Sequence, residues 1–410
     1  MNELLLTSGR FVIARRVTLF LSFLMSGGML VFPRMPLLFL LVVFGMLAAN
    51  FRVPIGREMW LLGLILLAVL GVSLLRPGPI HFESLAIRFG NVLGALIILN
   101  AYILAPSNSL THDLYMFFKL MGIQALLTVV LAKVAGFLFI PIAYKDLTYE
   151  SILLIFTYHT GIDSGGDALV RPDGFFFEPG VFQIYLNLYL YLALFEYRNF
   201  RQIILAIAAV LVTKSTTGII ICVTLLGSAL VVNLRSITNE RKFTLLLVAI
   251  TVAPILLYVG YDNLTGKISG ESKGSSLARE YDFYTGLNII REYPLMGIGF
   301  DPARYLENSY QFGYDDTIFG GENIEERSSS NGLIYMTYSL GVPLAALFLL
   351  GFFRQTIFRH KILIGMLLGL SLFGEAIIFT PFIMMIVFSA FTGRSYNILT
   401  SPSDHCVASK

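Results

Sequence analysis

Apolar residues form long runs along the whole chain, separated by short polar connections. About 20 apolar residues in a helix cross the roughly 30 Å hydrocarbon core of a bilayer, and backbone groups there must pair within their own segment. The pattern predicts an all-α polytopic membrane protein of about 12 transmembrane helices, a single integral membrane domain over residues 1–410. The expected spans are 17–32, 36–50, 59–75, 88–106, 117–141, 174–195, 202–213, 217–233, 243–260, 332–353, 362–378 and 380–393.

Composition supports this class, because 56% of the residues are hydrophobic, 13% are charged and the mean hydropathy is +0.76. A water-soluble domain cannot bury that much apolar surface. The first apolar run lacks a small-residue cleavage site and is followed at once by further runs, so we expect it to remain as a helix.

Lysine and arginine gather in alternate connections, which places those connections and the N-terminus in the cytoplasm. Two longer connections then lie outside, a first large periplasmic loop at 142–173 and a second at 261–331. In the second loop twelve acidic side chains outnumber six basic ones, so the net charge of +3 conceals a difference between the two sides. A connection this long is rarely without structure, and we expect short helices in both loops.

One stretch of the second loop has a helical pattern, with apolar residues every three or four positions, as in an amphipathic helix on a membrane surface. Arg279 and Arg291 lie on this helix about 120° apart, so at most one of them is aimed at a given pocket. The alternative is that both are solvated or snorkelling charges. The apolar positions are Leu277, Tyr281, Tyr284, Leu287 and Ile289 or Ile290.

Several classes of site are excluded. Of two cysteines, Cys222 lies within an apolar run and Cys406 in the expected cytoplasmic tail, so no outer-face disulfide joins them. The five histidines are scattered, without zinc spacing, and any metal would depend on carboxylates alone. Phosphate-binding loops, dinucleotide fingerprints and basic-aromatic stripes are missing, so we expect no cofactor, no metal and no nucleic acid.

The first loop ends in Arg171-Pro-Asp-Gly-Phe-Phe-Phe-Glu-Pro-Gly180. Proline and glycine direct the chain, and the phenylalanines are expected at the headgroup boundary. Glu178 would then point toward hydrocarbon, where a carboxylate costs roughly 2 to 3 kcal/mol near a helix centre and less toward the ends. Glu178 therefore needs a partner or a function, and a structural pairing with a nearby arginine is the alternative.

Other charges interrupt the apolar runs, and each either faces a polar cavity or is a structural or snorkelling residue. Arg88 is the most interesting, because it lies beside the two outer loops. The others are Lys133, Lys214 and Glu375.

Residues 305–327 mix aromatic, amide and acidic side chains, as a sugar-binding cleft does. An ordinary surface loop is the alternative. The candidate substrate-binding residues in and just after this stretch are Tyr305, Tyr314, Glu325, Glu326, Arg327 and Asn331, and those outside it are Arg88 and Arg291.

The order of these elements resembles that of the O-antigen polymerase (Wzy) family and the related O-antigen ligases. The resemblance covers residues 160–345 in pattern and the whole chain in topology. The similar segments are 171–180, Leu211-Val-Thr-Lys-Ser-Thr-Thr-Gly218, Arg279 with Tyr293-Pro-Leu-Met-Gly-Ile-Gly-Phe300, Ser330-Asn-Gly-Leu-Ile-Tyr335 and Leu340-Gly-Val-Pro343.

The resemblance implies a metal-independent glycosyltransferase with a GT-C-like architecture in the bacterial inner membrane, its active site facing the periplasm. The donor would be a glycan on undecaprenyl diphosphate, the acceptor a lipid-linked repeat unit, and a chain-length regulator protein a further candidate partner. Arginine stabilises a leaving diphosphate through its flat, permanent charge, which makes Arg171 and Arg279 the catalytic candidates and Arg88 the third. Glu178 is the expected base, with Glu325 and Glu326 as substitutes.

One departure from the family pattern favours a polymerase. Ligases have a His-Asn pair at the loop exit, where this chain has Ser330-Asn331. A ligase that transfers glycan to lipid A core remains the alternative. A lipid-linked oligosaccharide flippase and a non-catalytic scaffold are the rivals from other classes, although a transporter would more often show internal repeats.

Overall fold

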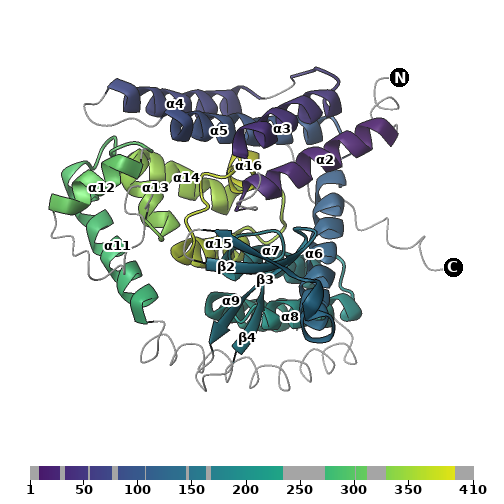
Figure 1. Ribbon diagram of the computed structural model, residues 1–410. Coiled ribbons are helices and arrows are strands. Elements are labelled where there is room, and N and C mark those ends of the chain that lie inside the picture. The colour runs from purple at the N-terminus through teal and green to yellow at the C-terminus, as the bar shows by residue number, and fades with distance from the viewer. Residues whose placement is uncertain are drawn as a thin grey trace.

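Helices make up most of the protein. The structure is a computed structural model that describes residues 9–27, 33–53, 56–75, 82–106, 108–144, 147–162, 168–233, 273–300, 302–311 and 329–392. The helices in these ranges are α2 (Gly9–Met25), α3 (Arg34–Ala48), α4 (Arg57–Leu75), α5 (Phe82–Ile103), α6 (Ser109–Val134), α7 (Pro179–Tyr191), α8 (Phe200–Val212), α9 (Thr216–Asn233), α11 (Lys273–Glu292), α12 (Pro302–Gln311), α13 (Gly332–Leu340), α14 (Val342–Arg354), α15 (Lys361–Gly374) and α16 (Pro381–Ser389) (Figure 1).

Two helices form the centre of the bundle. Every residue of α16 is buried, and so is nearly every residue of α7, as expected for helices that are apolar on all sides. Helix α16 packs against α2, α4, α5 and α14, and α7 packs against α6, α8, α9 and α15. In Figure 1 helices α3, α4 and α5 lie along the upper edge, while α11 and α12 lie at the left.

The prediction of a mostly helical chain is confirmed. Each expected span within the described residues overlaps a helix, and the span at 243–260 lies outside them. Of the described helices, α5 and α6 are the two long and apolar enough to cross a membrane by length and composition. The count of twelve spans stays a prediction.

One expected span is broken. Residues 332–353 form α13 and α14, which are separated at Gly341 (φ 78°). A positive φ suits glycine, and Pro343 has no N–H to continue the hydrogen-bond ladder. Near the break, the second loop supplies partners, since Ile298 N donates to Tyr338 O (2.7 Å) and Gly299 N to Ser339 O (3.1 Å).

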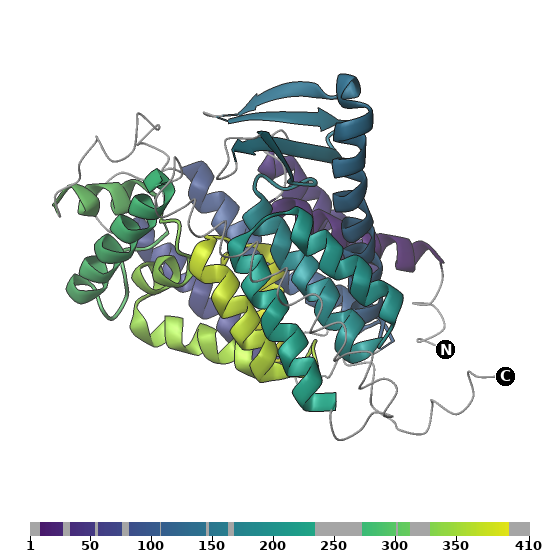
Figure 2. The same cartoon turned by 90° about the horizontal axis from the view of Figure 1, so that it is seen from below.

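The first loop contains a sheet, so the expectation of short helices there is wrong. Strands β1 (Ile140–Tyr144), β2 (Leu147–Ile152), β3 (Phe156–Ile162) and β4 (Ala168–Pro172) form an antiparallel sheet in chain order. Isoleucine, threonine and tyrosine are frequent in these segments and favour strands. Helix α6 contacts β3 and β4, and the sheet projects from the end of α6 in Figure 2.

The helix expected in the second loop is present as α11, but it buries a different face from the one predicted. Asp282, Gly286 and Ile289 are buried, whereas Tyr284 is 59% exposed. The reason is close packing on α13, because a Cβ at Gly286 would overlap Ile334. Glycine and a polar residue at the helix contact hide this face from a count of apolar positions.

Candidate active site

The junction between the first loop and α7 holds a group of interacting charged side chains. Arg171 lies on β4, and the chain turns at Gly174 (φ 65°) before Glu178, which is the residue just before α7 and makes no side-chain capping bond. The turn is fixed by two hydrogen bonds to Thr157 O, from Asp173 N (2.8 Å) and Gly174 N (3.2 Å). These bonds join the turn to β3, so the charged side chains sit on a rigid support.

Arg171 is partly buried among carboxylates. Burial lowers the pKa of its guanidinium, and the charges of Asp173, Glu178 and Glu375 oppose that shift. Its Nε atom is buried and has no hydrogen-bond partner among the described residues. These three carboxylates therefore act together on Arg171, and a diphosphate bound here would need further positive charge.

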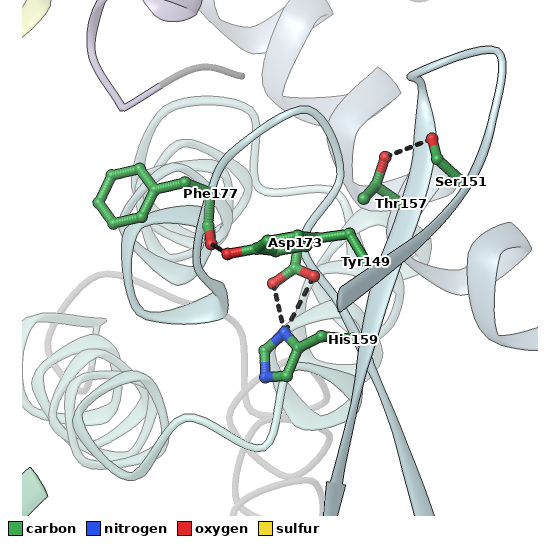
Figure 3. A network of polar contacts seen from close by, with 6 residues as sticks. All are labelled: Tyr149, Ser151, Thr157, His159, Asp173 and Phe177. Carbon is green, nitrogen blue, oxygen red and sulfur yellow. Dashed lines mark hydrogen bonds and ion pairs between the residues drawn. The ribbon is translucent and has the colours of Figure 1, made fainter. Parts of the chain in front are cut away.

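His159 and Asp173 form a pair (Figure 3), and His159 is the partner of Arg171 in the register of β3 and β4. The Nδ1 atom of His159 lies 3.0 Å from each carboxylate oxygen of Asp173. Burial raises the pKa of Asp173 to about 6, against the opposing hydrogen bond and charge of His159. Sequence reasoning missed both residues, although Asp173 lies within the segment 171–180. Only the pairing of β3 with β4 brings His159 to that segment.

Glu375 connects the first-loop junction to the exit of the second loop. It follows α15 and is 7% exposed. A Cβ at Gly180 would overlap its carboxylate, and a Cβ at Gly332 would lie 2.5 Å from its backbone oxygen. The first turn of α7 and the start of α13 therefore meet at Glu375, which the sequence identified only as one of several charges in apolar runs.

The exit of the second loop is tied to α11 through Asp282, which is fully buried. Its carboxylate accepts hydrogen bonds from Tyr305 Oη (2.6 Å), Ser330 N (2.9 Å) and Ser330 Oγ (2.7 Å). The three bonds hold α11, α12 and the start of α13 together.

Two expected substrate-binding residues have packing roles here. Tyr305 is 1% exposed and stacks on Tyr338 at 5.3 Å, so its ring has no open face for a sugar. Asn331 is 4% exposed, and its side-chain oxygen accepts hydrogen bonds from Leu333 N and Ile334 N, which caps α13.

The comparison with known families matches residues 203–349 to the model described as O-antigen ligase. This similarity over residues 203–349 supports the resemblance to O-antigen polymerases and ligases. Searches of curated proteins and of solved structures found no match. The family is one of membrane-associated, glycosyltransferase-like enzymes of O-antigen synthesis, and its model does not separate polymerases from ligases.

The matched segment runs from α8 into α14 and covers just over a third of the chain. It includes Arg279 and the segment 293–300, but it ends before Glu375 and begins after Arg171. The first-loop site is therefore supported by its own geometry and by the resemblance of 171–180.

The other candidate residues of the family resemblance are spread over α5 and the second loop. The Arg88 guanidinium carbon lies 5.5 Å from the centre of the Tyr335 ring, which places it beside α13. Arg279 is half-buried, is not among the charges acting on Arg171, and lies on the same helix as the exposed Arg291. Tyr314, Glu325, Glu326 and Arg327 lie outside the described residues.

The described part of the chain holds no group of three or more His, Cys, Asp or Glu residues that could hold a metal ion. The site is instead a mixture of arginine, carboxylates and one imidazole. Such groups can bind a phosphate, accept a proton and bind sugar hydroxyls.

Proposed function

We propose that this protein is a surface-polysaccharide (O-antigen) polymerase, which transfers a growing glycan from undecaprenyl diphosphate onto a lipid-linked repeat unit. The reaction takes place at the periplasmic face of the bacterial inner membrane, in a multi-pass protein of about 12 spans, without metal or cofactor. The observation that carries the proposal is the meeting of the two loop exits at Glu375, within reach of the Arg171 charge.

Arg171 is assigned to the leaving diphosphate. When the acceptor hydroxyl attacks the anomeric carbon, the bond from that carbon to the phosphate oxygen breaks and negative charge develops on the diphosphate. A buried guanidinium with an unpartnered Nε–H offers both charge and a directed donor for that oxygen. Arg88 and Arg279 are the cations proposed to complete the charge balance, and Glu178 is the base suggested by the sequence.

A polymerase is preferred to a ligase because of the loop exit. The position where ligases have histidine is Ser330 here, and both its backbone N and its hydroxyl bond the buried Asp282. This serine is a structural link in the described structure, not a free acid-base group. The ligase remains the second candidate, since the matching family model is described as O-antigen ligase. It would differ in its acceptor, lipid A core.

The test uses purified full-length protein with lipid-linked repeat units and neither metal nor ATP. We expect a ladder of longer glycans from the wild type and a loss of about 100-fold or more in rate for Arg171→Ala. Arg171→Lys keeps the charge but not the planar fork and should recover only part of the rate. Arg201→Ala removes an exposed arginine of α8 and serves as the matched control.

Three results would separate the alternatives. Transfer to lipid A core but not to repeat units would identify a ligase. Movement of a lipid-linked oligosaccharide from one leaflet of a vesicle membrane to the other, without growth of its glycan, would identify a flippase. A wild-type ladder from Arg171→Ala would show that the first-loop site is not where the reaction takes place.

A further inference from the structure

The His159–Asp173 pair has the geometry of an oriented base. Both carboxylate oxygens of Asp173 lie 3.0 Å from Nδ1 of His159, so Nδ1 is the atom that carries the proton toward the carboxylate. In a neutral imidazole the other nitrogen, Nε2, is then a hydrogen-bond acceptor. Nε2 has no hydrogen-bond partner among the described residues, and the His159 side chain keeps 14% exposure while that of Asp173 has none.

His159 also lies beside Arg171, the residue proposed to bind the diphosphate. It is the direct partner of Arg171 in the antiparallel register of β3 and β4, so the two side chains leave the same face of the sheet. The ring of Tyr149 on β2 contacts His159 edge-on at 6.1 Å, and its hydroxyl donates to Phe177 O (2.7 Å) (Figure 3). Neighbours on three sides hold the imidazole in one orientation.

The pair is not needed to attach the turn to the sheet. The backbone N–H groups of Asp173 and Gly174 already bond Thr157 O. Ser151 Oγ and Thr157 Oγ1 pair at 2.8 Å and add a second brace between β2 and β3. Burying a carboxylate costs desolvation free energy, and the backbone hydrogen bonds already attach the turn without it. Buried ionisable groups of this kind are frequent at functional sites.

We propose that His159 is the base that takes the proton from the attacking sugar hydroxyl, and that Asp173 is the positioning residue that orients it. The inference rests on the proposed glycosyl transfer. The hydroxyl proton moves to Nε2, the hydroxyl oxygen bonds the anomeric carbon, and the bond from that carbon to the phosphate oxygen breaks. Its electron pair leaves with undecaprenyl diphosphate beside Arg171, and the proton then passes from His159 to water.

This assignment displaces Glu178, the base suggested by the sequence. Imidazole is the side chain that most often serves as a general base, and here its Nε2 atom is the acceptor that Asp173 leaves available. The charged and titratable neighbours of His159 are Tyr149 on β2, Arg171 on β4 and Asp173 in the turn. The charge of Glu178 acts on Asp173 and on Arg171, and that of Glu375 acts on Arg171.

The experiment measures the initial rate of elongation of lipid-linked repeats against pH. His159→Gln should lose about 100-fold or more in kcat, with little change in KM for the donor, because Arg171 is intact. Asp173→Asn should lower kcat and shift the acidic limb of the profile. In His159→Ala, added imidazole should restore part of the rate. The matched control is Ser151→Ala/Thr157→Val, which removes a buried hydrogen bond from the same sheet and should stay within about twofold of wild type.

The outcomes are distinct. Wild-type rate and pH profile in His159→Gln would overturn the inference while leaving the polymerase proposal standing. Loss of the acidic limb in Glu178→Gln, together with an unshifted limb in Asp173→Asn, would also overturn it and restore Glu178 as the base. Should His159→Gln fail to fold, the Asp173→Asn profile decides, and an unchanged acidic limb there counts against the inference. Failure of the wild type to elongate would instead contradict the proposed function.

Discussion

Asp173→Asn should make the protein more stable at neutral and alkaline pH. Burial raises the pKa of this carboxyl from 3.8 to about 6, so the folded protein holds its proton more tightly than the unfolded chain does. The folded state therefore binds more protons between these two values, and its stability falls as pH rises through that window. Above it, the ionised carboxylate destabilises the fold by about 3 kcal/mol, since one pKa unit corresponds to about 1.4 kcal/mol.

The net shift already contains the attraction of His159 and Arg171, so it measures the cost that remains after both have acted. Asparagine keeps the shape and an acceptor oxygen but removes the charge. Thermal unfolding of the purified protein in detergent, at about pH 8 and about pH 4, measures the difference. We expect a higher unfolding midpoint for Asp173→Asn at about pH 8 and a nearly equal one at about pH 4. A wild type as stable as the variant at about pH 8 would refute this reasoning.

The remaining predictions concern the second loop. Gly297→Ala should destabilise the fold by about 2 kcal/mol or more, because φ at Gly297 is 58° and a Cβ would overlap the Tyr338 carbonyl. The control is Gly369→Ala, where a Cβ meets open space. Equal unfolding midpoints for the two variants would contradict the prediction. Arg279→Ala should lower elongation about 100-fold if its guanidinium assists the diphosphate, while the exposed Arg291→Ala should stay within roughly twofold. Equal ladders from both would remove Arg279 from the site.

The helices were predictable because apolar runs report burial directly. The all-buried α7 and α16 coincide with apolar runs, and α11 was found from its periodicity. The buried face of α11 was not found, because Asp282 and Gly286 gain their place from hydrogen bonds and close packing, which hydropathy does not measure.

The sheet and the paired charges depended on information that a single sequence does not show. The alternation in 140–172 resembled a polar loop, and two of its residues, Pro141 and Gly161, are poor strand formers. His159 reaches Asp173 only through the register of β3 and β4, so its role was invisible to motif spacing. Arg171 was predictable because it lies in a dense motif. The importance of Glu375 was not, because only the fold brings Gly180 and Gly332 against it.

The hydrogen bonds that join the segment before α12 to the interruption near Gly341 bear on how this chain could be recombined with a similar one. Ile298 N and Gly299 N donate to the carbonyls of Tyr338 and Ser339 in α13, and Val342 N donates to Pro294 O (2.7 Å). A chimera that exchanges only the outer loop would separate donors from acceptors inherited from different parents. A crossover placed after the first turn of α14 would keep all of these donors and acceptors from one parent. More chimeras with this boundary should fold than chimeras that exchange the outer loop alone.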